Sequence, residues 1–161
     1  GVETIEMWCP ERRPGGHNFA MELDPPLDVF GPQNAINGIA RPTTMPNAWA
    51  ADPNDPKPWL TLTWDSPQTI ARIVLEFDTD FDHPMESVQH GHPERAMPFC
   101  VKRYRVLDDQ GREVAACADN HQTRNVIHCT APIRTSRLSI EVLETHGKTP
   151  PALFGVHCFT E

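Results

Sequence analysis

The 161-residue sequence lacks any apolar run near the roughly 20 residues that a transmembrane helix needs. Basic residues are also few, with 14 Lys and Arg against 22 Asp and Glu, which gives a net charge of −8. This charge repels phosphate backbones and anionic lipid headgroups. We therefore expect neither nucleic acid nor a membrane surface as a partner.

Catalytic motifs are absent as well. There is no G-x-S-x-G, no H-E-x-x-H and no G-x-G-x-x-G or other phosphate-binding glycine loop. The carboxylates of Asp78, Asp80 and Asp82 are close enough in sequence for acid and base roles, but acidic loop residues are more often solvated or capping. We expect no catalytic residue, and no enzyme activity of this chain alone.

Five cysteines occur without any C-x-x-C spacing, so a structural zinc site of the usual kind is not expected. Two interpretations stay open. In an exported protein a Cys9 to Cys158 disulfide is favoured, because a β-sandwich tends to bring its ends together. In a cytosolic protein all five would be buried thiols.

The length and the turn residues indicate a single domain. Seventeen Pro and nine Gly are spread along the chain, as expected for turns between short strands rather than for disorder. We expect one domain over residues 1–161, in which residues 1–30 are an N-terminal extension or first strand and residues 31–161 are the sandwich core.

From Trp59 onward the apolar residues alternate with a period of two, which predicts antiparallel β-strands. Leu60, Leu62 and Trp64 share one face, and a long loop interrupts the pattern at residues 78–98. Before Trp59 we expect only a strand at residues 18–23 and a short helical turn around Asn34. The other strand segments expected to point apolar residues inward are Ala71 to Phe77, Tyr104 to Val106, Glu113 to Ala118, Asn125 to Cys129, Leu138 to Val142 and Phe154 to Cys158. The predicted fold is an all-β sandwich of about eight strands with little helix.

Antiparallel succession places alternate connections at opposite ends of such a sandwich. Turns at residues 65–68, 108–111 and 132–136 should fall at one end. Loops before residue 59 and at residues 78–98, 119–124 and 144–151 should fall at the other. That second end gathers a polar rim: Asp80, Asp82, His83, His90, His92, Arg95, His121, Arg124 and His146.

The polar rim has three open interpretations. Such side chains suit sugar recognition, because vicinal hydroxyls need donors and acceptors held at fixed geometry. Alternatively, each side chain satisfies backbone groups of a long loop. Thirdly, His90-Gly91-His92 near His83 could hold a transition metal.

Three marks resemble the opening of discoidin-like, galactose-binding-like domains: Asn34-Ala35-Ile36-Asn37-Gly38, then Trp49, then Pro58-Trp59-Leu60 before an apolar strand. Later segments, such as Phe77 to Glu86, His92 to Arg95 and Asp119 to Arg124, are similar to the C-terminal domain of some bacterial FAD-dependent oxidoreductases. The resemblance covers roughly residues 34–159. The flavin-binding part is missing, so no FAD is expected on this chain alone.

The resemblance implies an antiparallel jelly-roll sandwich with a binding site in the loops at one end. It also implies a Ca²⁺ near Asn34 and Asn37, although Asn37 stands in place of the usual Asp and Gly155 in place of an acidic residue. Both changes remove a negative oxygen ligand and should weaken or abolish calcium binding. The resemblance places Trp49, Trp59 and Trp64 in the core, with only Trp49 near enough to the rim to face a ligand.

These observations favour a non-catalytic carbohydrate-binding module in a secreted or periplasmic protein. The alternative is a structural or docking accessory domain of a larger parent enzyme, the FAD-dependent oxidoreductase of the resemblance. A glycan site needs an exposed aromatic ring beside a polar cluster, whereas a docking surface needs a contiguous apolar patch.

Overall fold

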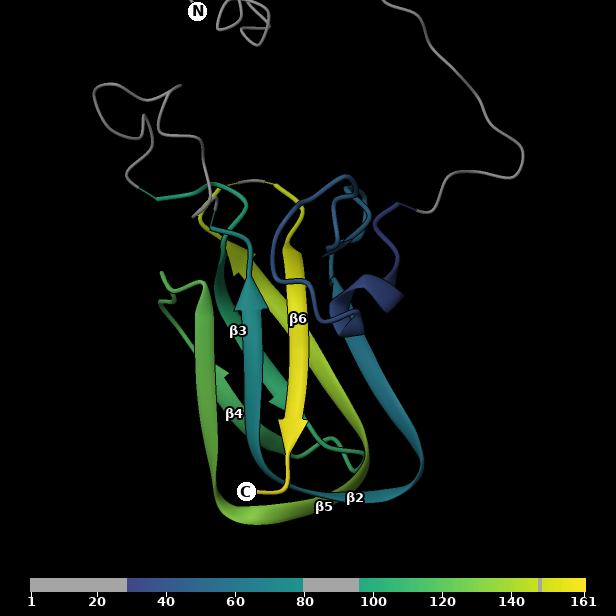
Figure 1. Ribbon diagram of the computed structural model, residues 1–161. Helices are drawn as coiled ribbons and strands as arrows, with labels where there is room; N and C mark the ends of the chain where they lie inside the picture. Colours follow the sequence, from purple (N-terminus) through teal and green to yellow (C-terminus); the bar gives the residue numbers. More distant parts are fainter. Residues whose placement is uncertain (1–28, 80–95, 148) are drawn as a thin grey trace, which may run out of the picture.

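The computed structural model describes residues 29–79, 96–147 and 149–161 (Figure 1). In this part of the chain, six strands pair antiparallel in the order β1-β6-β2-β5-β3-β4. The elements are a 3-10 helix η2 (Pro32–Ile36), then β1 (Trp49–Ala50), β2 (Trp59–Phe77), β3 (Val101–Leu107), β4 (Glu113–Cys117), β5 (Arg124–Thr145) and β6 (Ala152–Phe159). The all-β prediction and the helical turn near Asn34 are confirmed. The predicted strand at residues 18–23 lies outside the described residues.

The long strands β2 and β5 each run through both layers of the sandwich. The start of β2 pairs with the end of β5, from Trp59 opposite Glu141 onward, and the end of β2 pairs with the start of β5, up to Glu76 opposite Arg124. The first pairing continues into β3 and β4, and the second continues into β6 and β1. Counted by layer, the six strands therefore supply eight segments, and Figure 1 shows β2 and β5 curving together at the base.

The corner between the layers corrects one expectation. Residues 65–68 and 132–136 were expected to be turns between separate strands, but they lie inside β2 and β5. The register jumps there, because Thr63 faces Arg137 while Gln68 faces Thr135. Extra residues on one strand bend it without ending the ladder, so both strands turn the corner as a pair.

The core lies between the layers and follows the predicted alternation. Ile73, Leu75 and Phe77 of β2 are fully buried against Ile140 of β5 and Tyr104 of β3. The rings of Phe77 and Tyr104 lie 5.1 Å apart and join the two layers. Each such side chain contributes about 1.5–3 kcal/mol through burial, so the core holds the loops at both ends in place.

Strand β6 departs from the predicted alternation at one point. Phe154 is buried at 2% exposure, as expected, but its neighbour Leu153 is fully buried as well and is the residue that joins the main core cluster. The register between β2 and β6 shifts at Phe77, which pairs with Leu153, and this irregularity changes the face on which the preceding residues lie. Val156 and Cys158 do pack against the core as expected.

Contacts between distant loops confirm the predicted ends for the described residues. At one end, Asp109 Oδ2 accepts hydrogen bonds from the backbone N–H and the hydroxyl of Ser136, both 2.9 Å long. At the other end, the N–H of Asn120 donates to the carbonyl of Lys102. The same end holds residues 51–58, 119–123, 146–147 and 149–151, at the upper end of the sandwich in Figure 1.

Among the described residues no helix is long and apolar enough to cross a membrane. Cys158 is a free thiol, and Cys9 lies outside the described residues. The expected Cys9 to Cys158 disulfide therefore stays a prediction. Burial, with the nearby Cys129 thiol, raises the pKa of Cys158 to about 11.

Candidate functional site

Three of the nine predicted rim residues lie in the described part of the chain: His121, Arg124 and His146. The other six lie outside the described residues, and their placement stays a prediction: Asp80, Asp82, His83, His90, His92 and Arg95.

Asn120 anchors the rim loop that carries His121. Its side chain is buried, and its amide donates to the carbonyl of Val101 at 2.8 Å and to that of Gln122 at 3.2 Å. Its Oδ1 accepts from the N–H of Gln122 and from Nδ2 of Asn125, both at 2.9 Å. All polar atoms of the side chain are thus used in joining β3 to the loop before β5, which leaves this loop little freedom.

His121 and His146 meet on this support. Nε2 of His146 lies 2.7 Å from the carbonyl oxygen of Asn120 and donates to it as the N–H tautomer. The ring of His121 lies against that of His146, with centroids 4.3 Å apart and the ring planes tilted by 35°, and its Nε2 lies 3.4 Å from Asp119. The side chain of His121 is 53% exposed. The pair thus offers one anchored ring and one accessible ring to solvent.

The loop after β5 is held against the loop before β3. The N–H of Gly147 donates to the carbonyl of Pro98 at 2.6 Å, and the N–H of His146 donates to that of Cys100 at 3.1 Å. The hydroxyl of Thr145 donates to the carbonyl of Gly147 at 2.7 Å. The backbone that carries His146 is therefore tied at three successive residues.

Arg124 is held elsewhere. It begins β5 opposite Glu76 of β2, and its Nε lies 3.7 Å from Glu76 Oε1. The other oxygen of Glu76 lies 3.1 Å from Nε2 of His157 on β6. Gly155 leaves room for this contact, because a Cβ there would lie 2.6 Å from Glu76 Oε2. The structure thus brings His121 and His146 together and joins Arg124 to a carboxylate on the outer face of the sheet.

Among the described residues, the buried thiol at this end, that of Cys100, is unsuited to nucleophilic chemistry. Burial raises the pKa of Cys100 to about 11, and the negative charge of Asp78 adds to the effect. A thiol with a raised pKa stays protonated at neutral pH, and the thiolate is the reactive form. Cys100 therefore packs under the rim.

The predicted calcium ligands do not fit a calcium ion. Asn34 donates its amide hydrogens to the carbonyls of Val29 at 2.9 Å and Ala48 at 3.0 Å. Oδ1 of Asn37 accepts from the N–H of Ile39. Residues 29–51 contain no Asp or Glu, whereas Ca²⁺ sites rely on carboxylates. The described residues likewise contain no group of three or more His, Cys, Asp or Glu placed to hold a metal.

The tryptophans correct a further expectation. Trp49, expected to offer a face to ligand, is buried at 8% exposure, whereas Trp59, expected in the core, is 58% exposed. Trp64 packs against the core as expected. The strand alternation could have predicted the exposure of Trp59, because Leu60 points inward and its neighbour must then point outward.

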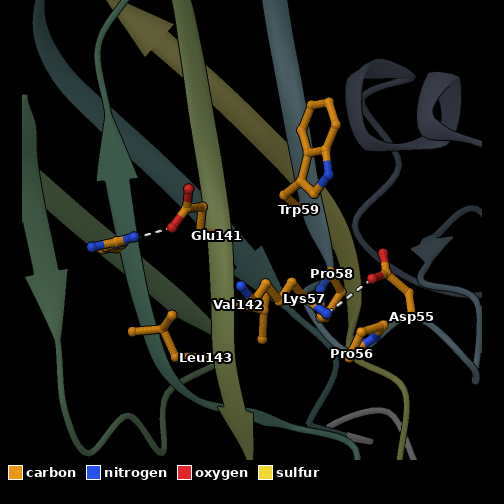
Figure 2. A pocket seen from close by; sticks show the side chains of 9 residues that line it. Asp55, Pro56, Lys57, Pro58, Trp59, Glu141, Val142 and Leu143 are labelled. Carbon is orange, nitrogen blue, oxygen red and sulfur yellow. Dashed lines mark hydrogen bonds and ion pairs between the residues drawn. The ribbon is translucent and has the colours of Figure 1, made fainter. Parts of the chain in front are cut away.

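Trp59 lies at an open pocket of about 520 Å³ on the outer face of the first layer. Figure 2 shows Trp59 and Glu141 on the neighbouring strands β2 and β5. The full lining is Asp55, Pro56, Lys57, Pro58, Trp59, Arg105, Glu141, Val142 and Leu143. Sequence reasoning did not propose this pocket.

Solved structures that resemble this chain include sugar-binding modules. The family 32 carbohydrate-binding module of Streptococcus pneumoniae EndoD matches with a TM-score of 0.59 at 13% identity, over 82% of this chain and 86% of the module. The chain has the discoidin-like, galactose-binding-like β-sandwich fold. The family 32 module of C. perfringens NanJ in complex with galactose matches with a TM-score of 0.57 at 12% identity, over 82% of this chain and 86% of that one.

The lectin domain of Lectinolysin complexed with Lewis B antigen has the same fold, with a TM-score of 0.57 at 14% identity, over 83% of this chain and 86% of that one. No protein-family model and no curated protein matches the sequence. Identities this low establish the fold alone.

Proposed function

We propose that this domain is a non-catalytic carbohydrate-binding module that holds a glycan at the polar rim. The observation that carries the proposal is the exposed His121 ring, packed against an anchored His146 at the loop end of a sandwich. Support comes from the fold, since solved modules of this fold include complexes with galactose and with Lewis B antigen. A glycan ligand also favours export of the protein to the periplasm or beyond.

Rigid support matters for such a site. Sugar hydroxyls are bound through directed hydrogen bonds, and a side chain that is already ordered loses less entropy on binding. The Asn120 network and the backbone ties of His146 supply that order before any ligand arrives. Imidazole groups can both donate to and accept from hydroxyls.

A glycan-array screen of residues 1–161, with and without chelator, is the first test. Against a glycan found there, His121→Ala should weaken binding by about 1–3 kcal/mol, the cost of losing a buried hydrogen bond to ligand. Arg124→Ala, which removes a cation next to the rim, should weaken it in the same direction. Isothermal titration calorimetry measures both.

His128→Ala is the matched control, because His128 is an exposed histidine on β5 away from the rim. It should leave the affinity for the glycan unchanged, and all variants should keep the melting temperature of the unmutated domain. If the double variant His121→Ala with Arg124→Ala binds a confirmed glycan as the parent does, the rim is loop scaffolding and the proposal is wrong.

A docking role is a second candidate, favoured by exposed apolar side chains in the segment before β1. Phe30, Ile36, Ile39 and Met45 are each at least 40% exposed. Ile36→Ser with Met45→Ser should abolish docking to a parent enzyme and leave glycan binding intact. If this variant loses glycan binding at an unchanged melting temperature, the glycan site lies in the segment before β1 and not at the polar rim.

A further inference from the structure

The pocket at Trp59 is built by three strands and the segment before them. Trp59 begins β2 and pairs with Glu141 on the neighbouring strand β5. Glu141 pairs in turn with Arg105 of β3, on the other side of β5. The three side chains therefore form one row across the outer face of the sheet. Residues 55–58 enclose one side of the row, and Val142 donates its N–H to the carbonyl of Pro58 at 2.9 Å, which fixes that segment to β5.

The apolar part of the pocket is open to solvent. Trp59 is 58% exposed and Leu143, two residues beyond Glu141 on the same face, is 47% exposed. An indole ring is large, flat and rigid, so it supplies contact area at low conformational cost. The flat face of a pyranose ring carries C–H groups that pack on such a surface.

The polar part is an ion pair with unused hydrogen-bonding capacity. Arg105 Nε donates to Glu141 Oε2 at 2.6 Å, and the two side chains are 43% and 31% exposed. A guanidinium has five N–H donors and a carboxylate has about four acceptor positions, so one shared bond leaves most of them for a ligand. Because each group orients the other, the donor and acceptor directions are fixed.

We propose that the Trp59 pocket is a second sugar site, at which a neutral pyranose stacks on Trp59 and hydrogen-bonds through vicinal hydroxyls to Arg105 and Glu141. The lining carries Lys57 and Arg105 against Asp55 and Glu141, which balances its charge and favours a neutral ring over an acidic or amino sugar. Its volume of about 520 Å³ lies within the ~300–1,000 Å³ common for small-ligand sites.

This site shares no lining residue with the polar rim, and it does not depend on sugar binding there. His121 and His146 lie in the loops that precede and follow β5, whereas the Trp59 row lies on the outer sheet face, beside residues 55–58 of the same end. Variants at one site should therefore leave the other unchanged.

The test is an NMR titration of the tryptophan indole N–H signals with methyl β-galactopyranoside, methyl β-glucopyranoside and methyl β-mannopyranoside. The four tryptophans are distinguished by a Trp59→Phe variant, in which the Trp59 signal disappears. At least one neutral pyranoside should shift the Trp59 signal saturably, and glucuronic acid and glucosamine should bind more weakly. Trp59→Ala should weaken binding at least ~10-fold, with Trp59→Phe losing less.

Glu141→Gln and Arg105→Lys test the polar half and should each weaken the titration at unchanged melting temperature. His121→Ala is the control and should leave it unaltered. The proposal is overturned if no neutral pyranoside shifts the Trp59 signal, or if Glu141→Gln and Arg105→Lys bind as the parent does. Loss of the Trp59 shift in His121→Ala would overturn the independence of the two sites.

Discussion

Asp108 shows how one side chain organises the end of the sandwich opposite the rim. It is only 3% exposed, yet its Oδ1 accepts from the N–H groups of Gln110 and Arg112, both at 2.9 Å, and its Oδ2 accepts from Arg112 Nε at 2.7 Å. Burial opposes ionisation, but these hydrogen bonds outweigh it and lower the pKa of the carboxyl. The turn reverses at Gly111, whose φ of 75° favours glycine.

We predict that Asp108→Asn lowers the free energy of unfolding by about 1–3 kcal/mol at pH 7, because the turn loses its charged acceptor. A lowered folded-state pKa stabilises the fold above the unfolded value of about 3.9, and this contribution is lost as the pH falls through the folded-state pKa. The gap between variant and parent should therefore shrink at low pH. Urea unfolding at several pH values measures it.

The control for that prediction is Asp65→Asn, an exposed carboxyl at the same end. It should change stability by less than ~0.5 kcal/mol. A gap between Asp108→Asn and the parent that stays constant down to pH 2 would contradict the role assigned to the ionised carboxyl.

At the scale of elements, the loop end depends on close approach of two connections. Gly147 follows β5, and a Cβ there would lie 2.7 Å from the Cβ and 3.0 Å from the Cα of Pro98, before β3. Proline atoms of a loop already tied by a 2.6 Å hydrogen bond cannot move aside at little cost. The two connections therefore require glycine at this position.

We predict that Gly147→Ala costs about 1–3 kcal/mol of stability, through overpacking, and weakens glycan binding by displacing the adjacent His146. Gly155→Ala is the matched control, because its Cβ would come within 3 Å of only the ends of the Glu76 and His157 side chains, which can rotate away. It should cost less than ~1 kcal/mol. Thermal unfolding ranks the two variants, and equal losses would contradict this account of Gly147.

For the whole molecule, the resemblance raised the question of a structural calcium ion. The Asn34 and Asn37 region is closed by amide and backbone hydrogen bonds and contains no carboxylate. A ligand that binds only the folded state raises the melting temperature with its concentration. We predict that neither millimolar CaCl₂ nor excess EDTA changes the melting temperature of residues 1–161. A rise with calcium that EDTA reverses would contradict it.

From Trp59 onward the sequence by itself indicated which segments are extended, the inward face of β2 and the ends at which the loops gather; it did not indicate β1 at Trp49–Ala50. These follow from alternation of period two, which is a local property of an extended chain. The same alternation implied an outward Trp59, although resemblance to a family placed it in the core. It also placed His121 and His146 at one end, since each antiparallel strand reverses direction.

Only the tertiary structure decided which side chains meet. The expected short strands join into β2 and β5 because the two strands bend together as a pair at the corner between the layers. The row from Trp59 through Glu141 to Arg105 depends on the register of three strands. Arg124 pairs with Glu76 for the same reason. Register is fixed by packing between residues far apart in the chain, so no local pattern in the sequence carries it.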